Sequence, residues 1–389
     1  MIEEHTSSTH PPLPPTTEDT RYTWLRLLRS RRVGPVTFHR LLDTYGSAQN
    51  ALAALPEVAR TAGVKGYEIC PASTVDAELD AAKAAKARLL CFCDPEYPEQ
   101  LKDLADAPPL IWAKGDLSAL KRPAVSLVGA RNASSLGLRM ARALARGLGQ
   151  DGQVVISGLA RGIDTSAHEA ALETGTIAVL AGGVDVIYPA ENAQLADRIC
   201  ETGLLLSEQP MGLPPKARHF PKRNRIIAAL GRALVVVEAA AKSGSLITAR
   251  DALDLGREVM AVPGHPFDAR AAGCNLLIRD GAALIRGSKD VLATLPPAEA
   301  LHKPQRPAAD ELPAPPPEKR SLKETAMLHQ EILNRLGPSP LPEDQLIRDL
   351  ATSAQEVGPA LVELELQGDV DRQPGGLICR KINSDDISR

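Results

Sequence analysis

Six short apolar runs alternate with amphipathic helical patterns between Ala124 and Ile285, and this alternation constrains the fold more than any other feature of the chain. Each run is rich in Val, Ile or Leu, as is typical of strands that are buried on both faces of a sheet. Strands that alternate with helices predict an α/β fold around a parallel sheet. The predicted strands are Val125–Val128, Val154–Ser157, Ile177–Leu180, Leu204–Ser207, Leu234–Glu238 and Val259–Val262.

The segments before this region predict a small separate module. Residues 1–20 are polar and rich in proline, which predicts a disordered lead. Residues 21–66 carry short helical patterns broken by Gly-Pro and Gly-Ser, which predict a helical module. Residues 67–122 form a connecting segment, with a helix over Val75–Ala87 and a short strand over Leu89–Phe92, and the α/β domain then occupies residues 123–295.

A second boundary follows the α/β domain. Residues 296–320 contain eight prolines among charged residues, which predicts an extended linker. Residues 321–389 then carry helical patterns over Leu322–Leu336, Glu343–Leu350 and Ala354–Gln367, followed by short strands over Val370–Arg372 and Leu377–Arg380. Three helices and a hairpin predict a winged-helix domain.

The third of these helices contains Glu356, Glu363 and Glu365. In a winged helix this would be the recognition helix, and acids there repel phosphate. Two functions of the winged helix therefore remain possible at this stage: binding DNA or binding a protein.

The charge and cysteine content restrict the possible partners and sites. A formal net charge of −3 gives no global attraction to nucleic acid, so a polyanion site requires a local concentration of Lys and Arg. The six cysteines show no C-x-x-C spacing, which argues against a zinc site and a disulfide framework. The absence of a long apolar run and of a secretory signal favours a cytoplasmic protein without membrane contact.

The special residues of the α/β domain follow its predicted strands. In a parallel sheet, loops at the carboxyl ends of the strands share one edge, and ligands bind there. We therefore expect these loops to lie close together. They are Gly129–Asn132, Ser157–Asp164, Ala181–Gly183, Ala241–Ser245 and the segment Lys216–Arg225 before the next helix.

The segment Lys216–Arg225 has the composition of a single-strand binding site. It holds five Lys or Arg residues, no acid and the aromatic residue Phe220. Lys and Arg neutralise phosphates, while a ring stacks on a base. Arg131, Arg161 and Lys242 follow strands at the same predicted edge and add to the positive charge. A solvated basic loop, with Phe220 as an apolar anchor for the following helix, is the alternative.

Common catalytic and cofactor motifs are not found. Arg131 stands where the second glycine of a dinucleotide fingerprint is required, which argues against NAD, and no P-loop occurs. Asp164 and His168 share one helix face, but we expect structural roles, Asp164 as an N-cap and His168 packed beneath the loop. Glu238 and Asp185 are acids at strand or loop ends, but no nucleophile and base accompany them to complete a catalytic constellation. We expect a non-catalytic protein without cofactor or metal.

Taken in order, these motifs and several others resemble the DNA-processing protein A (DprA, also called Smf) family over about Trp24 to Arg380. The further matching elements are Tyr97-Pro98, Pro108-Pro109, Gly182-Gly183 with Tyr188-Pro189, Ser207-Glu208, Phe220–Ile227, Lys242–Ala249, Val262-Pro263-Gly264 and Gly273-Cys274-Asn275. The resemblance implies an extended Rossmann-like domain between a sterile-alpha-motif-like helical module and a winged helix. It also implies homodimerisation, single-stranded DNA binding and loading of the RecA recombinase during natural transformation.

The resemblance also implies which residues contact DNA. Carried over by motif, they are Arg131, Ser157, Gly158, Phe220, Arg223, Asn224, Lys242 and Ser243, with Arg161 and Lys222 as neighbours. Lys216 is displaced from the usual family spacing, so its role is open. The segment Glu258–Leu284 is suspected to hold the dimer and recombinase surfaces.

Two other functions compete with this interpretation. Nucleotide phosphoribohydrolases share the Rossmann-like fold, but their Pro-Gly-Gly-x-Gly-Thr loop is not matched by Ala181–Asp185. Turnover of a nucleoside monophosphate would favour them. A winged-helix transcription regulator with an α/β sensor domain is the second alternative, and preference for duplex DNA would favour it.

Overall fold

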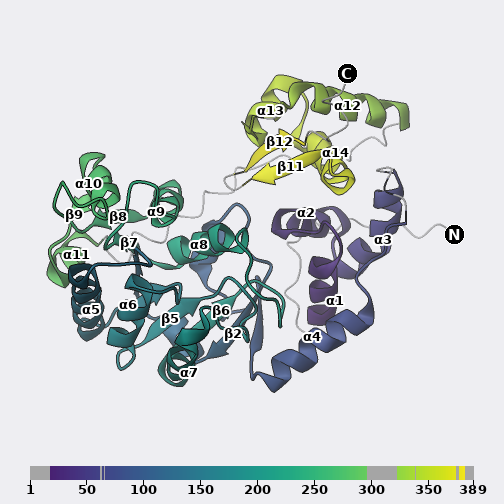
Figure 1. Ribbon diagram of the computed structural model, residues 1–389. Helices are drawn as coiled ribbons and strands as arrows, with labels where there is room; N and C mark the ends of the chain where they lie inside the picture. Colours follow the sequence, from purple (N-terminus) through teal and green to yellow (C-terminus); the bar gives the residue numbers. More distant parts are fainter. Residues whose placement is uncertain are drawn as a thin grey trace. The chain divides into compact units, whose positions relative to one another are not determined.

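The computed structural model describes residues 18–61, 64, 66–295, 322–337, 339–373 and 376–381, and these residues form two compact units (Figure 1). The larger unit combines Ala77–Leu104 with the described part of Leu110–Pro307. The smaller unit combines Ala105–Pro109 with the described parts of Met1–Asp76 and Ala308–Arg389. The predicted linker 296–320 lies outside the described residues, as does the predicted lead except for residues 18–20, which begin a helix.

The larger unit contains a nine-stranded sheet in the order β1-β2-β6-β5-β4-β3-β7-β8-β9. Strands β6, β5, β4, β3, β7, β8 and β9 are parallel to one another. Strand β2 pairs antiparallel with β6, and β1 pairs antiparallel with β2. Their bounds are β1 Arg88–Cys91, β2 Leu110–Gly115, β3 Ala124–Val128, β4 Val154–Ser157, β5 Thr176–Val179, β6 Leu204–Ser207, β7 Ala233–Val236, β8 Glu258–Ala261 and β9 Ala283–Leu284.

The predicted α/β fold is therefore confirmed, and all six predicted strands lie within two residues of their observed positions. The predicted strand Leu89–Phe92 corresponds to β1, displaced by one residue. The sequence analysis did not predict β2, which pairs with β6 in antiparallel register and buries Leu110–Ala113.

Helices cover both faces of the sheet because the strand order reverses direction at β3 (Figure 1). The chain runs outward from β3 to β6 with α5, α6 and α7 on one face, then crosses to β7 and β8 with α8 and α9 on the other. The bounds are α5 Ser135–Gln150, α6 Ile163–Ala171, α7 Ala193–Thr202, α8 His219–Leu230, α9 Ser245–Asp254, α10 Ala272–Arg279 and α11 Ser288–Thr294.

Helix α5 illustrates how the sequence forms this layer. Ser134 caps its first turn by accepting a hydrogen bond from the Gly137 N–H at 3.0 Å. Ala141, Leu144 and Leu148 recur at helical spacing and are fully buried against the sheet in the apolar core. The loop Gly129–Ser134 is thereby fixed between a buried strand and a capped helix.

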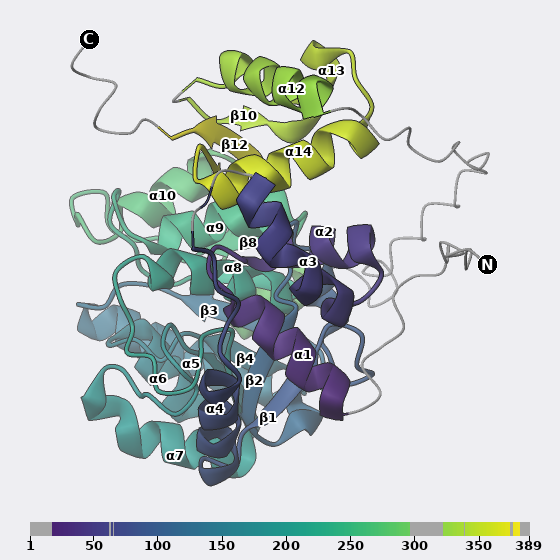
Figure 2. The same ribbon diagram turned by 90° about the vertical axis from the view of Figure 1, so that its right-hand side faces the viewer.

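The smaller unit contains an N-terminal helical module and a winged helix (Figure 2). Trp24 and Phe38 pack edge to face in the module, with ring centroids 5.1 Å apart. The predicted winged helix is confirmed, with its small sheet in the order β10-β12-β11. The elements are α1 Glu18–Arg29, α2 Pro35–Tyr45, α3 Ala48–Thr61, α12 Leu322–Arg335, β10 Leu341–Pro342, α13 Glu343–Leu350, α14 Ala354–Gln367, β11 Val370–Gln373 and β12 Leu377–Arg380, and α4 (Ala72–Ala84) leads into the larger unit.

No helix in the described ranges is both long and apolar enough to cross a membrane.

A buried hydrogen bond between α4 and β2 gives a test of how the antiparallel extension is attached. The Trp112 indole N–H donates to a Glu78 carboxylate oxygen at 2.9 Å, and both side chains are buried. The Met211 N–H donates to the same oxygen at 3.3 Å, so Glu78→Ala leaves both N–H groups without this acceptor, and we expect the free energy of unfolding to fall by about 1–3 kcal/mol. Urea unfolding followed by Trp112 fluorescence, in a Trp24→Phe background, measures it.

The matched control is Glu78→Gln, whose side-chain oxygen can still accept this hydrogen bond and which should lose less stability. Equal stability of Glu78→Ala and the parent protein would show that the hydrogen bond contributes nothing to the attachment of α4.

Candidate nucleic-acid interface

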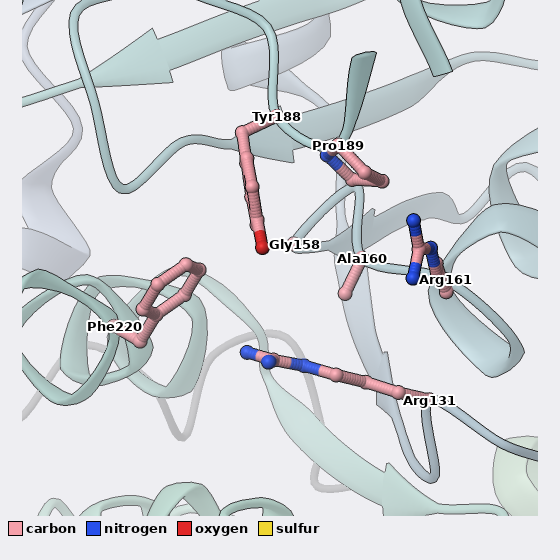
Figure 3. A pocket seen from close by; sticks show the side chains of 7 residues that line it. All are labelled: Arg131, Gly158, Ala160, Arg161, Tyr188, Pro189 and Phe220. Carbon is pink, nitrogen blue, oxygen red and sulfur yellow. The ribbon is translucent and has the colours of Figure 1, made fainter. Parts of the chain in front are cut away.

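A pocket opens at the carboxyl edge of the parallel strands (Figure 3). It contains about 360 Å³ of empty space, part of it open to solvent. The loops after β3, β4 and β5 and the first turn of α8 supply its lining. Of the five segments predicted to converge, Gly129–Asn132, Ser157–Asp164 and Lys216–Arg225 contribute lining residues, whereas Ala181–Gly183 and Ala241–Ser245 do not. The lining residues are Arg131, Gly158, Ala160, Arg161, Tyr188, Pro189 and Phe220.

Phe220 lies between a cation and a second aromatic ring. The Arg131 guanidinium lies over the Phe220 ring, 4.9 Å from its centroid. The Tyr188 ring meets Phe220 edge to face at 5.8 Å, and Tyr188 is 54% exposed (Figure 3). Cation–π and edge-to-face contacts both favour this geometry. The pocket thus combines a positioned, accessible ring with a positive charge.

The loop after β4 forms one wall of the pocket through a strained backbone. Leu159 has a φ of +54°, which is uncommon for a residue other than glycine, and its side chain is fully buried. Its N–H donates to the His168 Nε2 at 3.3 Å, and its carbonyl accepts a hydrogen bond from the Asn192 amide at 2.9 Å. Buried partners on both sides hold the backbone in this conformation.

Asp164 supports the same loop, but not in the predicted way. The sequence analysis expected an N-cap, whereas Gly162 occupies that position and Asp164 lies inside the first turn of α6. Its carboxylate accepts hydrogen bonds from the N–H groups of Gly158 at 3.1 Å and Ala160 at 3.3 Å. The prediction of an N-cap was therefore wrong, because the carboxylate turns back to the preceding loop instead of to its own helix.

His168 is a buried, neutral side chain. The Thr176 hydroxyl donates to the Val155 carbonyl, so it accepts the hydrogen bond from the His168 Nδ1, 2.7 Å away. The Nε2 accepts from Leu159, which requires the tautomer protonated at Nδ1. Burial, aided by the nearby Arg223 charge, lowers the pKa of His168 to about 3. This imidazole supports the loop and is not placed to act as a base on a ligand.

Two of the residues expected to contact DNA lie beneath the pocket instead. Arg223 is only 5% exposed and donates to the Val179 carbonyl at 2.7 Å, and burial lowers its pKa to about 10. A β-carbon at Gly158 would lie 1.7 Å from Nη1 of this guanidinium, so any other residue there would force the Arg223 side chain to move. Ser157 is fully buried and donates to the Leu127 carbonyl at 2.7 Å.

Arg161 reaches the pocket but is already paired. Its guanidinium contacts the Glu191 carboxylate at 2.6 Å, and both side chains are more than half exposed. Glu191 was not predicted, and its negative charge lies beside the expected DNA contacts. An exposed ion pair of this kind is weak, so a phosphate could replace the carboxylate as the partner of Arg161.

The remaining predicted contacts lie outside the pocket lining. Lys222 and Lys242 are exposed, while Asn224 and Ser243 are partly buried. The Ser245 hydroxyl donates to the Gly129 carbonyl at 3.1 Å, so the Lys242 loop lies beside the loop that carries Arg131.

The basic segment Lys216–Arg225 was predicted to lie before the helix, but α8 begins at His219, so most of the segment lies inside it. His219 has its pKa lowered by burial and by the neighbouring charges of Arg218, Lys222 and Lys216. Lys216, whose role was open, is exposed, and its backbone N–H donates to the His219 ring at 3.2 Å. Positive charge therefore concentrates locally in a chain whose net charge is negative.

Tyr188 and Pro189 are pocket residues that the predicted contacts did not include. Both belong to the Tyr-Pro motif after β5, and an aromatic residue after a strand at this edge was a signal for a binding role. The two acids considered in the sequence analysis have structural partners: Glu238 accepts from the Ser134 N–H at 2.9 Å and Asp185 from the Gly212 N–H at 2.9 Å. Within the described ranges, no three His, Cys, Asp or Glu side chains cluster as metal ligands do.

The buried histidine predicts a pH-dependent stability. The pKa of His168 is about 3 when folded and about 6.5 when unfolded, so only the unfolded chain binds this proton between those values. The contribution is complete above pH 6.5 and is lost as the pH falls toward 3, at about 1.4 kcal/mol per pH unit. We expect His168→Gln, which keeps an acceptor for Leu159, to lose less stability than the parent between pH 7 and pH 5.

Urea unfolding at the two pH values, followed by Trp112 fluorescence in the Trp24→Phe background, measures this difference. An identical loss in both proteins would mean that His168 is protonated in the folded chain.

Comparison with known proteins matches three parts of the chain. Residues 88–296 match the family DNA recombination-mediator protein A, residues 18–81 the DprA-like N-terminal HHH domain, and residues 314–376 the DprA winged helix domain. The resemblance stated above implied a sterile-alpha-motif-like N-terminal module, and the matching description of this region is an HHH domain.

Relatives match most of the chain. Protein Smf of Synechocystis sp. is 33% identical over 90% of this chain and 96% of its own length. The X-ray structure of DprA from Streptococcus pneumoniae is 35% identical, with a TM-score of 0.58, over 71% of this chain and 97% of its own. A structure of DNA processing protein A from Helicobacter pylori, described for its single-stranded DNA binding mode, is 30% identical with a TM-score of 0.50. The match covers 54% of this chain and 95% of the Helicobacter pylori chain. The chain therefore belongs to the DNA recombination-mediator protein A (DprA/Smf) family.

Proposed function

We propose that the pocket at the strand ends binds single-stranded DNA. The observation that carries the proposal is the position of Phe220, whose ring is partly exposed between the Arg131 guanidinium and Tyr188. A base can stack on an accessible ring only where it is unpaired, whereas a duplex keeps its bases stacked on one another. The Helicobacter pylori relative, described as binding single-stranded DNA, supports the proposal.

The pocket is small, so it would take one nucleotide of a longer strand. Its seven lining residues surround about 360 Å³ of empty space, which includes open solvent. Arg131 lies inside it, and the exposed Lys222 and Lys242 lie beyond its lining. Such cations would neutralise the phosphates on either side of the bound nucleotide. Recognition through stacking and phosphate contacts is tolerant of sequence and depends on salt.

The finer roles follow from family membership. We propose that the chain protects incoming single strands and loads the RecA recombinase onto them in natural transformation and recombination, and that it acts in the cytoplasm as a homodimer. The edge strand β9 supports a dimer, because Leu284 on it is 47% exposed and an open strand edge is a site for pairing. This residue ends the segment Glu258–Leu284 that the sequence analysis suspected.

We propose a binding function without catalysis, metal or ATP. The side chains considered as catalytic candidates have structural partners: Asp164 and His168 support the loop after β4, and Asp185 accepts from Gly212. Single-strand binding should therefore persist after metal chelation and without nucleotide.

Two substitutions at Phe220 separate stacking from apolar anchoring. Loss of one stacked base costs about 1–3 kcal/mol, so Phe220→Ala should weaken binding of fluorescent poly-dT by about 5- to 150-fold. Phe220→Leu keeps an apolar side chain but offers no ring. If the ring stacks on a base, both variants bind weakly; full binding by Phe220→Leu would assign Phe220 to anchoring and contradict the proposal. Unchanged urea unfolding confirms that each variant is folded.

The salt dependence of binding tests the role of Lys242. Removing one phosphate contact should reduce the slope of log affinity against log salt by about 0.7 for a single strand. We expect this reduction for Lys242→Ala and not for Lys83→Ala, which removes an exposed lysine of α4. A slope unchanged in Lys242→Ala, measured by mobility titration at several salt concentrations, would remove this residue from the DNA path.

A further inference from the structure

Four charged side chains connect the N-terminal helical module with the winged helix, and we call them the ion cluster: Arg40, Glu343, Glu365 and Arg372. Arg40 of α2 donates to the Glu343 carboxylate of α13 at 2.6 Å. Arg372 of β11 donates to Glu343 at 2.6 Å and to Glu365 of α14 at 2.9 Å. Arg40 and Glu365 lie 3.7 Å apart, so all four charges are neutralised within one network.

The ion cluster is largely removed from solvent. The four side chains are between 10% and 23% exposed. Arg40 Nη1 and Arg372 Nη2 are buried and have no hydrogen-bond partner within the described residues. Burying ions in this way is costly and adds little stability, but removing one partner of such a network is strongly unfavourable. We therefore expect the network to favour one arrangement of the two domains over alternatives.

Polar and apolar contacts extend this interface along α14. The hydroxyl of Thr37, on the same side of α2 as Arg40, donates to Glu365 at 3.0 Å, and Thr37 is 4% exposed. Val362 lies three residues before Glu365 and is 6% exposed, yet it is not part of the apolar core of the winged helix. Helix α14 packs against both α2 and α3 in the smaller unit (Figure 2).

In a helix-turn-helix fold, the helix equivalent to α14 enters the major groove of DNA. Here it carries acids and its Val362–Glu365 side faces the helical module. We propose that the N-terminal helical module is the docking site for the winged helix of the same chain, and that α14 serves this docking and does not read DNA.

The covalent chain permits docking within one molecule, because a linker joins the winged helix to the α/β domain that follows the helical module. The segment 296–321 has 26 residues, which can span up to about 90 Å when extended. A tethered partner is present at an effective concentration of about millimolar, far above that of a second copy in a micromolar solution. The occupant of the docking site is therefore the winged helix of the same chain.

Hydrogen exchange on the full-length protein tests the proposal. Arg40→Glu places a third carboxylate against Glu343 and Glu365, so we expect amide exchange in residues 354–367 to rise by about tenfold or more. Exchange in residues 35–45 should rise with it, while exchange in the α/β unit and the affinity for poly-dT stay unchanged. The matched control is Arg60→Glu, a charge reversal at a 77% exposed arginine of α3. Arg40→Ala, measured in parallel, gives the same result without an added charge.

Three outcomes would overturn the proposal. Unchanged exchange over 354–367 in both Arg40 variants would show that the ion cluster does not hold the domains together. Protection of 354–367 that increases with protein concentration would assign the site to a second copy. Protection of the same residues on addition of duplex DNA to the parent protein would show that α14 reads DNA.

Discussion

The pocket depends on polar groups buried beneath the loop after β4. Leu159 adopts a left-handed backbone there, and it does so because His168 and Asn192 bind its N–H and its carbonyl. Asp164 holds the amides on either side. Buried polar groups must find partners, and these partners leave no other path for the loop. Asp164 and His168, which could suggest an active site, are thus engaged in holding the loop that lines the pocket.

Local charge explains how an acidic chain could attract a polyanion. Burial and the neighbouring charges of Arg218, Lys222 and Lys216 lower the pKa of His219, and the Arg131 guanidinium lies over the Phe220 ring. The opposite arrangement occurs at the winged helix, where two arginines and two glutamates cancel within the ion cluster. The cations of the first surface are largely exposed, whereas the charges of the second are paired and mostly buried. This contrast favours the strand-end pocket as the DNA site.

The sequence predicted features that follow from local patterns. Strands buried on both faces appear as apolar runs, and the winged helix appears as three helical periods and a hairpin. The burial of Arg223 was not predictable, because arginine is usually exposed and its partners Val179 and Asp164 are distant in the sequence. Strand β2 was missed because its partner β6 lies about ninety residues later. The ion cluster joins residues 303 positions apart, which no local pattern encodes.

Photocrosslinking of an oligo-dT strand that carries halogenated uracil tests the central claim most directly, because crosslinks form to aromatic side chains stacked on a base. Mass spectrometry of the crosslinked protein then identifies the residues in contact. We predict crosslinks to Phe220 or Tyr188, reduced by competing single strands and not by duplex. Crosslinks confined to residues 322–381 would contradict the account and place the DNA on the winged helix.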